Sequence, residues 1–326
     1  MSRHERIRAE DPVGSSVLDA IGRTPLIELS RITGGLDGRI IAKLEYLNPG
    51  GSKKDRIALR MIRDAEASGD LAPGQSVVEL TSGNTGTGLA IVCAVTGHPF
   101  VAVMSAGNSE ERALMMRALG AEVILVDQQE GSKDGHVSGA DLALVEEVAA
   151  HTARERGAYR ADQFHLGGNP AAHEEAAAEI WERSGGEVGA FCDFLGTGGT
   201  FAGMARFFKA EDPSIACYAV EPTGAAVLAG EPLIEPGHRI QGGGYSMSSL
   251  PLLDTTLVDG FIEVADTGAI DTARRLARTE GIFAGFSSGA VVHAAEGLLA
   301  GPLAGATIAV VLADSGMKYL STDLWS

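Results

Sequence analysis

The chain has 326 residues, of which 45% are hydrophobic, so it is long enough for one large domain or two ordinary ones with their own cores. Its 26 Lys and Arg residues against 43 Asp and Glu residues give a formal net charge of −17. Because so acidic a surface repels phosphate backbones and anionic lipid head groups, we expect no nucleic acid partner and no membrane partner. A small-molecule ligand is compatible with that charge, since its pocket can be locally positive.

The N-terminal segment and the cysteines favour a cytoplasmic protein. Residues 1–13 are polar and lack the apolar core of a signal peptide. Cys93, Cys192 and Cys217 are scattered through apolar surroundings, as reduced core thiols are. There is no CxxC pair and no paired histidine spacing, so we expect no metal site.

Short apolar segments alternate with amphipathic stretches along the chain. The segments are apolar on both faces, which is typical of parallel strands covered by helices. The alternation predicts an α/β fold with mostly parallel sheets. In chain order we expect a strand at 39–44, a helix at 55–68, a strand at 77–80, a helix at 86–96, a strand at 100–104, a helix at 109–119, a strand at 122–126, helices at 141–156 and 171–183, a strand at 191–195, a helix at 200–211, a strand at 216–220, helices at 269–279 and 290–299, and a strand at 307–312.

Ligands of open α/β sheets bind in the loops that follow the strands, and residues 48–56 (NPGGSKKDR) form the first such loop. Asn-Pro-Gly-Gly favours a turn, and Ser52 is a good N-cap for the next helix. A lysine at the start of a helix lies near backbone N–H groups and the positive end of the helix dipole. That environment lowers the pKa of an amine and makes it nucleophilic toward a carbonyl. The alternative is a pair of solvated surface lysines, Lys53 and Lys54.

The second loop, residues 81–86 (TSGNTG), follows a predicted strand and precedes an apolar helix. Four of its six residues carry hydrogen-bonding side chains, and free N–H groups at a helix N-terminus attract anions. The loop therefore suits a carboxylate. A simple capped turn is the alternative.

The third loop, residues 196–200 (GTGGT), also lies between a predicted strand and a predicted helix. Its glycines let the backbone approach a phosphate, and Thr197 and Thr200 add hydroxyl donors. A dinucleotide-binding fingerprint would need a third glycine where Phe201 stands, and a Walker lysine is absent. The loop therefore predicts a site for a single phosphate monoester.

The fourth loop, residues 285–289 (GFSSG), places Ser287 where a hydroxyl can hydrogen-bond a neutral ring nitrogen. The alternative is a cap for the helix at 290–299. Together the four loops offer an activated amine, a carboxylate site, a phosphate site and a partner for a ring nitrogen. Those are the groups needed to bind pyridoxal phosphate and an amino acid.

The motifs resemble those of cysteine synthase (O-acetylserine sulfhydrylase) and of the catalytic core of cystathionine β-synthase. They follow the family's order from residues 21–26 (IGRTPL) to residues 314–322 (DSGMKYLST). The resemblance implies fold type II of the pyridoxal-phosphate enzymes, with two α/β domains like those of tryptophan synthase β and the cofactor cleft between them. It implies a larger cofactor-binding domain of residues 1–45 and 157–326, a smaller mobile substrate-binding domain of residues 46–156, and a homodimer.

The resemblance also implies roles for individual residues. Residues 52–56 match the family's S-x-K-D-R, which makes Lys54 the catalytic lysine that holds the cofactor as a Schiff base and leaves Lys53 at the variable position. Asn84 matches the residue that contacts the ring hydroxyl. The full set implied for the cofactor is Lys54, Asn84, Gly196, Thr197, Gly198, Gly199, Thr200 and Ser287, and the set implied for the substrate carboxylate is Thr81, Ser82, Gly83, Thr85 and Gln163.

The implied reaction is β-replacement on a β-substituted L-amino acid such as an O-activated serine. Lys54 removes the α-proton, the β-substituent leaves, and sulfide or another nucleophile adds to an aminoacrylate intermediate. Three segments depart from the family. Residues 242–247 (GGGYSM) replace its G-I-G-A-G-F loop, residues 128–139 form a slightly longer loop, and residues 165–170 (HLGGNP) replace its N-P-A-N. A β-elimination lyase of the serine/threonine dehydratase type therefore remains the alternative.

Overall fold

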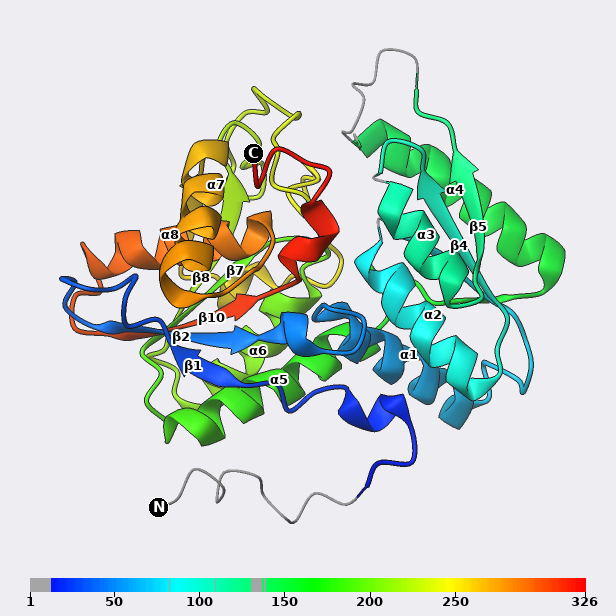
Figure 1. The fold of residues 1–326 in the computed structure, drawn as a ribbon, viewed down its shortest axis with the longest axis horizontal. Helices are drawn as coiled ribbons and strands as arrows, with labels where there is room; N and C mark the ends of the chain where they lie inside the picture. The colour runs from blue at the N-terminus through cyan, green and yellow to red at the C-terminus, as the bar shows by residue number, and fades with distance from the viewer. Residues whose placement is uncertain (1–12, 82, 109, 130–136, 138) are drawn as a thin grey trace.

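The computed structural model describes residues 13–81, 83–108, 110–129, 137 and 139–326. The chain forms two lobes, each with its own sheet (Figure 1). All strand pairs among these residues are parallel except the pairing of the first two strands. The expected pair of α/β domains with mostly parallel sheets is confirmed.

The larger sheet has six strands and the smaller sheet has four. The larger has the spatial order β1 (Leu26–Glu28), β2 (Arg39–Leu44), β10 (Thr307–Leu312), β7 (Ala190–Phe194), β8 (Ala216–Pro222) and β9 (Gly260–Val264). The smaller has the order β5 (Glu122–Val126), β4 (Phe100–Ser105), β3 (Val77–Leu80) and β6 (Tyr159–Arg160).

The helices connect these strands in the order that the sequence predicts. They are α1 (Lys54–Ser68), α2 (Asn84–Thr96), α3 (Glu110–Ala118), α4 (Gly139–Arg156), α5 (Gly168–Ser184), α6 (Gly199–Glu211), α7 (Asp266–Arg275) and α8 (Phe286–Leu299). Short 3-10 turns lie at η1 (Val17–Ala20), η2 (Glu45–Leu47), η3 (Thr255–Leu257) and η5 (Gly316–Tyr319), and α7 continues as one π-helical turn, η4 (Leu276–Glu280).

Each sheet is covered by helices on both faces. In the larger lobe α7 and α8 pack on one face and α5 and α6 on the other. In the smaller lobe α1, α2 and α3 cover one face, whereas α4 covers the face turned away from the larger lobe (Figure 1). The helix pairs of the larger lobe approach closely at glycines: a Cβ on Gly203 of α6 would lie 2.1 Å from the Pro170 carbonyl oxygen, and one on Gly289 would lie 2.0 Å from that of Ala269.

The sequence prediction missed three strands, and all three lie at sheet edges. β1 and β9 border the larger sheet and β6 borders the smaller one. Their residues are mostly half-buried rather than buried on both faces, so they lack the continuous apolar pattern that marks a central parallel strand.

The position of β6 bears on the boundary between the domains. We expected the smaller domain to end at residue 156, but Tyr159 and Arg160 pair with β3 of the smaller sheet. We therefore propose that the smaller domain extends through Arg160 and that the second part of the larger domain begins after it.

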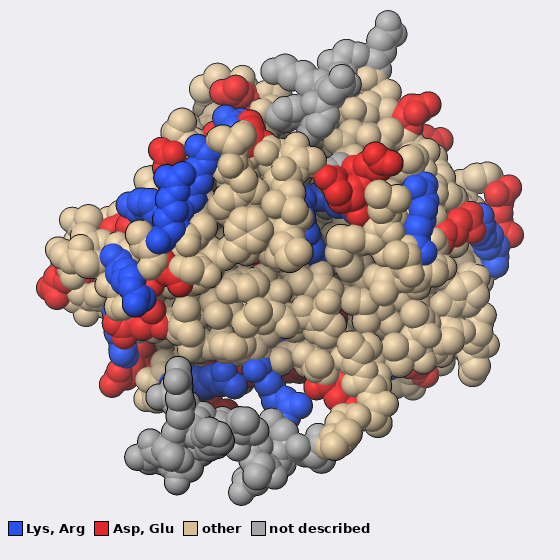
Figure 2. Space-filling model, in the orientation of Figure 1, with Lys and Arg blue, Asp and Glu red and all other residues tan. Residues whose placement is uncertain are grey.

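The surface in Figure 2 carries both signs of charge. Basic and acidic side chains lie side by side at several places on this face, including one group above its centre, whereas the lower middle is uncharged. The net acidity therefore does not gather into one acidic patch on this side. Among the described residues, no helix combines the length and the apolar character that a membrane span requires.

Candidate active site

One pocket lies where the N-termini of four helices converge. α1, α2, α6 and α8 all begin at or beside it, and such helix ends favour a bound anion. β7 and β10 end at the same place, as expected for a ligand site of parallel sheets. The pocket is lined by Lys53, Lys54, Asn84, Asp193, Phe194, Gly196, Thr197, Gly198, Thr200, Gln241, Gly242, Ser287, Ala313 and Asp314.

Lys54 begins α1 and is half-buried in this pocket. Burial and the neighbouring charge of Lys53 lower the pKa of Lys54 to about 7, although the carboxylates of Asp193 and Asp314 oppose this shift. Its amine is therefore neutral in a large share of molecules near pH 7, as a nucleophile needs to be. The causes of the lower pKa are burial and a like charge, whereas we expected the helix dipole and the backbone N–H groups at the start of the helix to lower it.

Lys53 is buried as well, so the alternative of two solvated lysines is wrong. Only 8% of Lys53 is exposed, and its Nζ lies 3.0 Å from Oδ1 of Asp193 on β7. Lys53 also occupies the N-cap position that we expected for Ser52, whose Oγ instead accepts a hydrogen bond from the Lys54 N–H at 3.3 Å.

The phosphate-loop residues adopt a shape that depends on glycine. Gly198 has φ of +82°, a conformation that L side chains rarely adopt. A Cβ on Gly196 would lie 2.9 Å from the carbonyl oxygen of Gly242, and one on Gly199 would lie 2.2 Å from Oδ1 of Asn169. The loop therefore packs against its neighbours too closely for side chains and leaves its backbone open to a ligand.

Two residues of α5 hydrogen-bond the threonine hydroxyls of this loop. Asn169 Nδ2 donates to Thr197 Oγ1 at 3.0 Å, and His173 Nε2 lies 3.1 Å from Thr200 Oγ1. Burial holds the pKa of His173 well below its ordinary value, so the ring is neutral. In the tautomer that carries its proton on Nε2, His173 donates to Thr200, both hydroxyl oxygens accept, and both hydroxyl protons remain available for a bound phosphate.

Ser287 faces the pocket from the first turn of α8. We find no hydrogen bond from its side chain within the described ranges, and the N-cap of α8 is Gly285. The neighbouring Ser288 has a different role, because its Oγ accepts a hydrogen bond from the Ala313 N–H at 3.1 Å. The capping alternative therefore does not account for Ser287.

Asn84 lies in a polar cluster that the sequence did not indicate. Its Nδ2 donates to Asp314 Oδ2 at 2.7 Å, and its Oδ1 accepts from Lys318 Nζ at 2.7 Å. The Tyr319 hydroxyl donates to the same oxygen of Asp314 at 2.6 Å. These contacts fix the Asn84 amide at the edge of the pocket.

Among the residues expected to bind the substrate carboxylate, those that the structure describes do not line the pocket. Thr81 Oγ1 accepts from the N–H groups of Gly83 and Gly86 at 3.1 and 2.7 Å, so the capped-turn alternative describes Thr81. Thr85 Oγ1 donates to Gln163 Oε1 at 2.6 Å, which brings these two together as expected. Ser82 lies outside the described residues.

A larger cavity of about 360 Å³ adjoins the pocket and shares Gln241 and Gly242 with it. Arg112 donates to Gln241 Oε1 at 2.7 Å and stacks over the Tyr319 ring. The departing loop 242–247 forms one wall of this cavity, whereas much of the departing loop 128–139 lies outside the described residues. The 242–247 loop, which differs from the family pattern, therefore lies next to the candidate site.

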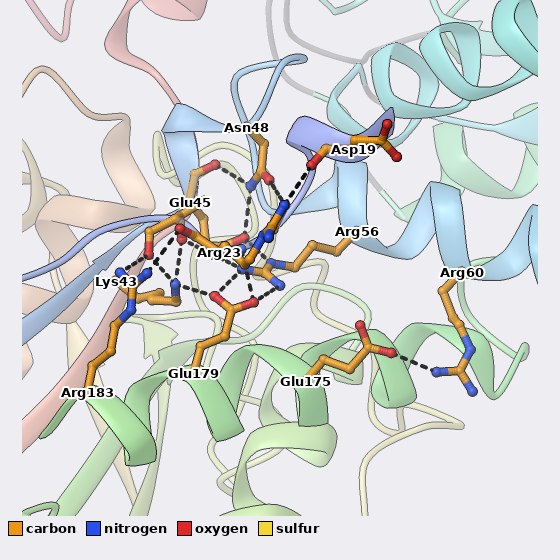
Figure 3. A network of polar contacts seen from close by, with 12 residues as sticks. Asp19, Arg23, Lys43, Glu45, Asn48, Arg56, Arg60, Glu175, Glu179 and Arg183 are labelled. Carbon is orange, nitrogen blue, oxygen red and sulfur yellow. Dashed lines mark hydrogen bonds and ion pairs between the residues drawn. The ribbon is translucent and has the colours of Figure 1, made fainter. Parts of the chain in front are cut away.

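A buried charge network attaches the lysine-bearing helix to the larger lobe (Figure 3). Arg56, two residues after Lys54, donates to Glu45 at 2.8 and 2.9 Å and to Glu179 of α5 at 2.7 and 2.8 Å. Lys43 adds a second cation 2.5 Å from Glu179. Although burial raises the pKa of Glu179, the Arg56 and Lys43 charges lower it to about 2.

Comparison with known proteins agrees with this geometry. A family model described as "Pyridoxal-phosphate dependent enzyme" matches residues 17–314. The cysteine synthase of Staphylococcus aureus (strain Mu50 / ATCC 700699) is 39% identical over 322 residues, which are 98% of this chain and 99% of the relative. The O-ureido-L-serine synthase of Streptomyces lavendulae is 39% identical over 318 residues, which are 96% and 93%. A crystal structure of cysteine synthase from Entamoeba histolytica has a TM-score of 0.89 at 34% identity and covers 97% of this chain and 92% of that one.

The chain therefore belongs to the family of pyridoxal-phosphate-dependent enzymes, and its cofactor is pyridoxal 5′-phosphate. The donors in the pocket fit that molecule. The threonine hydroxyls and the start of α6 suit its phosphate, and a half-buried amine suits its aldehyde.

Proposed function

We propose that the chain replaces the β-substituent of an O-activated L-serine with a nucleophile, which is sulfide or another small nucleophile. The observation that carries this proposal is the convergence of the Lys54 amine, the 196–200 loop and Ser287 in one pocket. The names of the relatives support it, because cysteine and O-ureido-L-serine differ only in the group on the β-carbon. The cavity beside the pocket supplies room for that group.

In this proposal Lys54 Nζ would hold the cofactor and would then take the proton from the substrate α-carbon. The bound cofactor supplies the electron sink for that α-carbon. A pKa of about 7 supports both roles, since the amine can attack when neutral and can hold a proton afterwards.

The remaining residues hold the cofactor and the substrate. Thr197, Thr200 and the glycines of their loop bind the phosphate, Asn84 faces the ring hydroxyl, and Ser287 faces the ring nitrogen. A serine is a neutral partner, so it leaves the ring nitrogen unprotonated and limits the electron sink. This property favours loss of the β-substituent over transamination.

The substrate carboxylate binds Thr81, Ser82, Gly83, Thr85 and Gln163 in this proposal. Thr85 and Gln163 hydrogen-bond each other, so this bond has to open before they can bind the carboxylate. The loop that carries Thr85 would therefore move onto the substrate. Closing that loop would exclude water from the reacting atoms.

We also propose that the protein is a cytoplasmic homodimer. The three cysteines of the chain are all free and buried, as a reducing compartment permits.

The proposal is tested by adding O-acetyl-L-serine and other O-activated serines to the holoenzyme and recording its visible spectrum. A productive substrate should change the cofactor absorbance, and sulfide should restore the original spectrum while cysteine accumulates. A spectrum that no O-activated serine alters would exclude this substrate class.

The threonine hydroxyls should contribute measurably to cofactor affinity. We expect the Thr197→Val/Thr200→Val variant to bind pyridoxal phosphate more weakly, because each hydroxyl loses a hydrogen bond to a charged phosphate. Each bond is worth about 1.5–3 kcal/mol, or roughly 10- to 150-fold in Kd. Equilibrium titration of the apoenzyme measures this, with Thr152→Val on α4 as the control, since Thr152 Oγ1 donates to the Val148 carbonyl of its own helix. An unchanged Kd would place the phosphate elsewhere.

Ser287 and its neighbour Ser288 provide a matched pair. Ser287→Ala should weaken cofactor binding by about 0.5–1.5 kcal/mol and leave the unfolding free energy of the apoenzyme unchanged. Ser288→Ala should instead destabilise the fold by about 1–3 kcal/mol, because it leaves the Ala313 N–H without its acceptor. Denaturant unfolding and cofactor titration separate the two effects, and a stability loss in Ser287→Ala would restore the capping interpretation.

A further inference from the structure

Two adjacent lysines line the cofactor pocket, although a single amine is needed to attach the cofactor. Lys53 and Lys54 both contribute to the pocket wall. Attachment forms a C=N bond between an amine nitrogen and the aldehyde carbon, and the aldehyde oxygen leaves as water. Only a neutral amine has the lone pair for this attack, so an ammonium beside it does not react.

The two lysines differ in their partners. Lys53 Nζ forms an ion pair with Asp193 Oδ1 at 3.0 Å, and both side chains are at least nine-tenths buried. Within the described ranges we find no hydrogen bond or ion pair from Nζ of Lys54. A carboxylate in direct contact stabilises the charged form of an amine, and this effect is strong where water is excluded.

We propose that Asp193 selects the lysine that reacts, because it holds Lys53 as an ammonium and leaves Lys54 as the one nucleophilic amine in the pocket. Asp193 is thus a positioning residue that acts through Lys53. The ammonium of Lys53 in turn lies close enough to Lys54 to disfavour a second positive charge there. This inference rests on the proposed role of Lys54.

The other charged groups around the pair are consistent with this assignment. Asp314, which follows β10, acts on Lys54 but forms its hydrogen bonds with Asn84 and Tyr319. Burial and then the charges of Lys53 and Lys54 lower the pKa of His173 on α5, which is therefore neutral. Burial raises the pKa of Asp193, whereas the charges of Lys53 and Lys54 oppose that rise, and its Oδ1 is in direct contact with Lys53 Nζ.

The experiment locates the cofactor by reducing the holoenzyme with sodium borohydride and mapping the modified residue by fragment-ion mass spectrometry. In the wild-type enzyme the label should lie on Lys54. In Asp193→Asn, which keeps the size of the side chain and removes its charge, the share of label on Lys53 should rise by at least about tenfold. Asp193→Glu restores a carboxylate and should return the label to Lys54.

A second pair of variants removes the competition between the lysines. Lys54→Ala alone should leave Lys53 unlabelled at pH 7, whereas Lys54→Ala/Asp193→Asn should carry the label on Lys53. Label on Lys53 in Lys54→Ala with Asp193 intact would overturn the inference, and this arm does not depend on the folding of the Asp193→Asn chain. Label on Lys53 in the wild-type enzyme would instead overturn the proposed role of Lys54.

Discussion

Lys54→Ala should abolish covalent attachment of the cofactor and lower turnover by at least about 10²–10⁴-fold, since one amine serves both as the attachment point and as the base. The variant should still bind pyridoxal phosphate reversibly, because the phosphate loop and Ser287 are intact. Absorbance of the dialysed protein and steady-state assays measure the two effects.

A lysine away from the pocket gives the control for this prediction. Lys209 on α6 pairs with Asp259 at 2.6 Å and lines neither the pocket nor the adjoining cavity. Lys209→Ala should retain both the bound cofactor and turnover. If Lys54→Ala kept its cofactor covalently through dialysis, another residue would have to be the attachment point.

Arg56→Met should be the most destabilising substitution near the site. It leaves Glu45, which is fully buried, and Glu179 without the guanidinium that bonds both of them. Removing one partner of a buried ion pair costs about 3–5 kcal/mol because the other charge stays buried. The free energy of unfolding, measured in urea, should fall by that amount. Loss of activity should accompany it, since α1 also bears Lys54.

Arg60 on the same helix is the matched control. It pairs with Asp64 and Glu175 through contacts of 2.8 and 2.9 Å, but all three side chains are well exposed. Surface pairs of this kind contribute about 0–1 kcal/mol, so Arg60→Met should have little effect. Equal losses in the two variants would indicate that the buried network in Figure 3 does not anchor α1.

The sequence predicted the central part of the fold well because burial on both faces leaves a clear pattern. The bounds of β2, β3, β5 and β10 agree with the prediction residue for residue. The edge strands β1, β6 and β9 lack that pattern and were missed, whereas the edge strand β5 has an apolar run and was predicted. The resemblance to cysteine synthase is confirmed by the family match and by relatives that align over nearly the whole chain.

The candidate site was predictable only where one segment carries a whole motif. The 196–200 loop and Lys54 lie within such motifs, and the structure brings them together in one pocket. The partners from other segments were not predictable, since Asp193 is 140 residues from Lys53 and Asn169 is 28 residues from Thr197. The sequence did contain one indication of the Asp193–Lys53 pair. Asp193 is a charged residue inside the otherwise apolar strand β7, and a buried charge needs a partner.

The partition of products tests the central claim most directly. The holoenzyme would be supplied with O-acetyl-L-serine and sulfide, and acetate, cysteine, pyruvate and ammonia would be quantified together. The proposed β-replacement predicts cysteine in amounts equal to the acetate released, with little pyruvate or ammonia. Pyruvate and ammonia in amounts equal to the acetate, without cysteine, would contradict it and identify a β-elimination lyase.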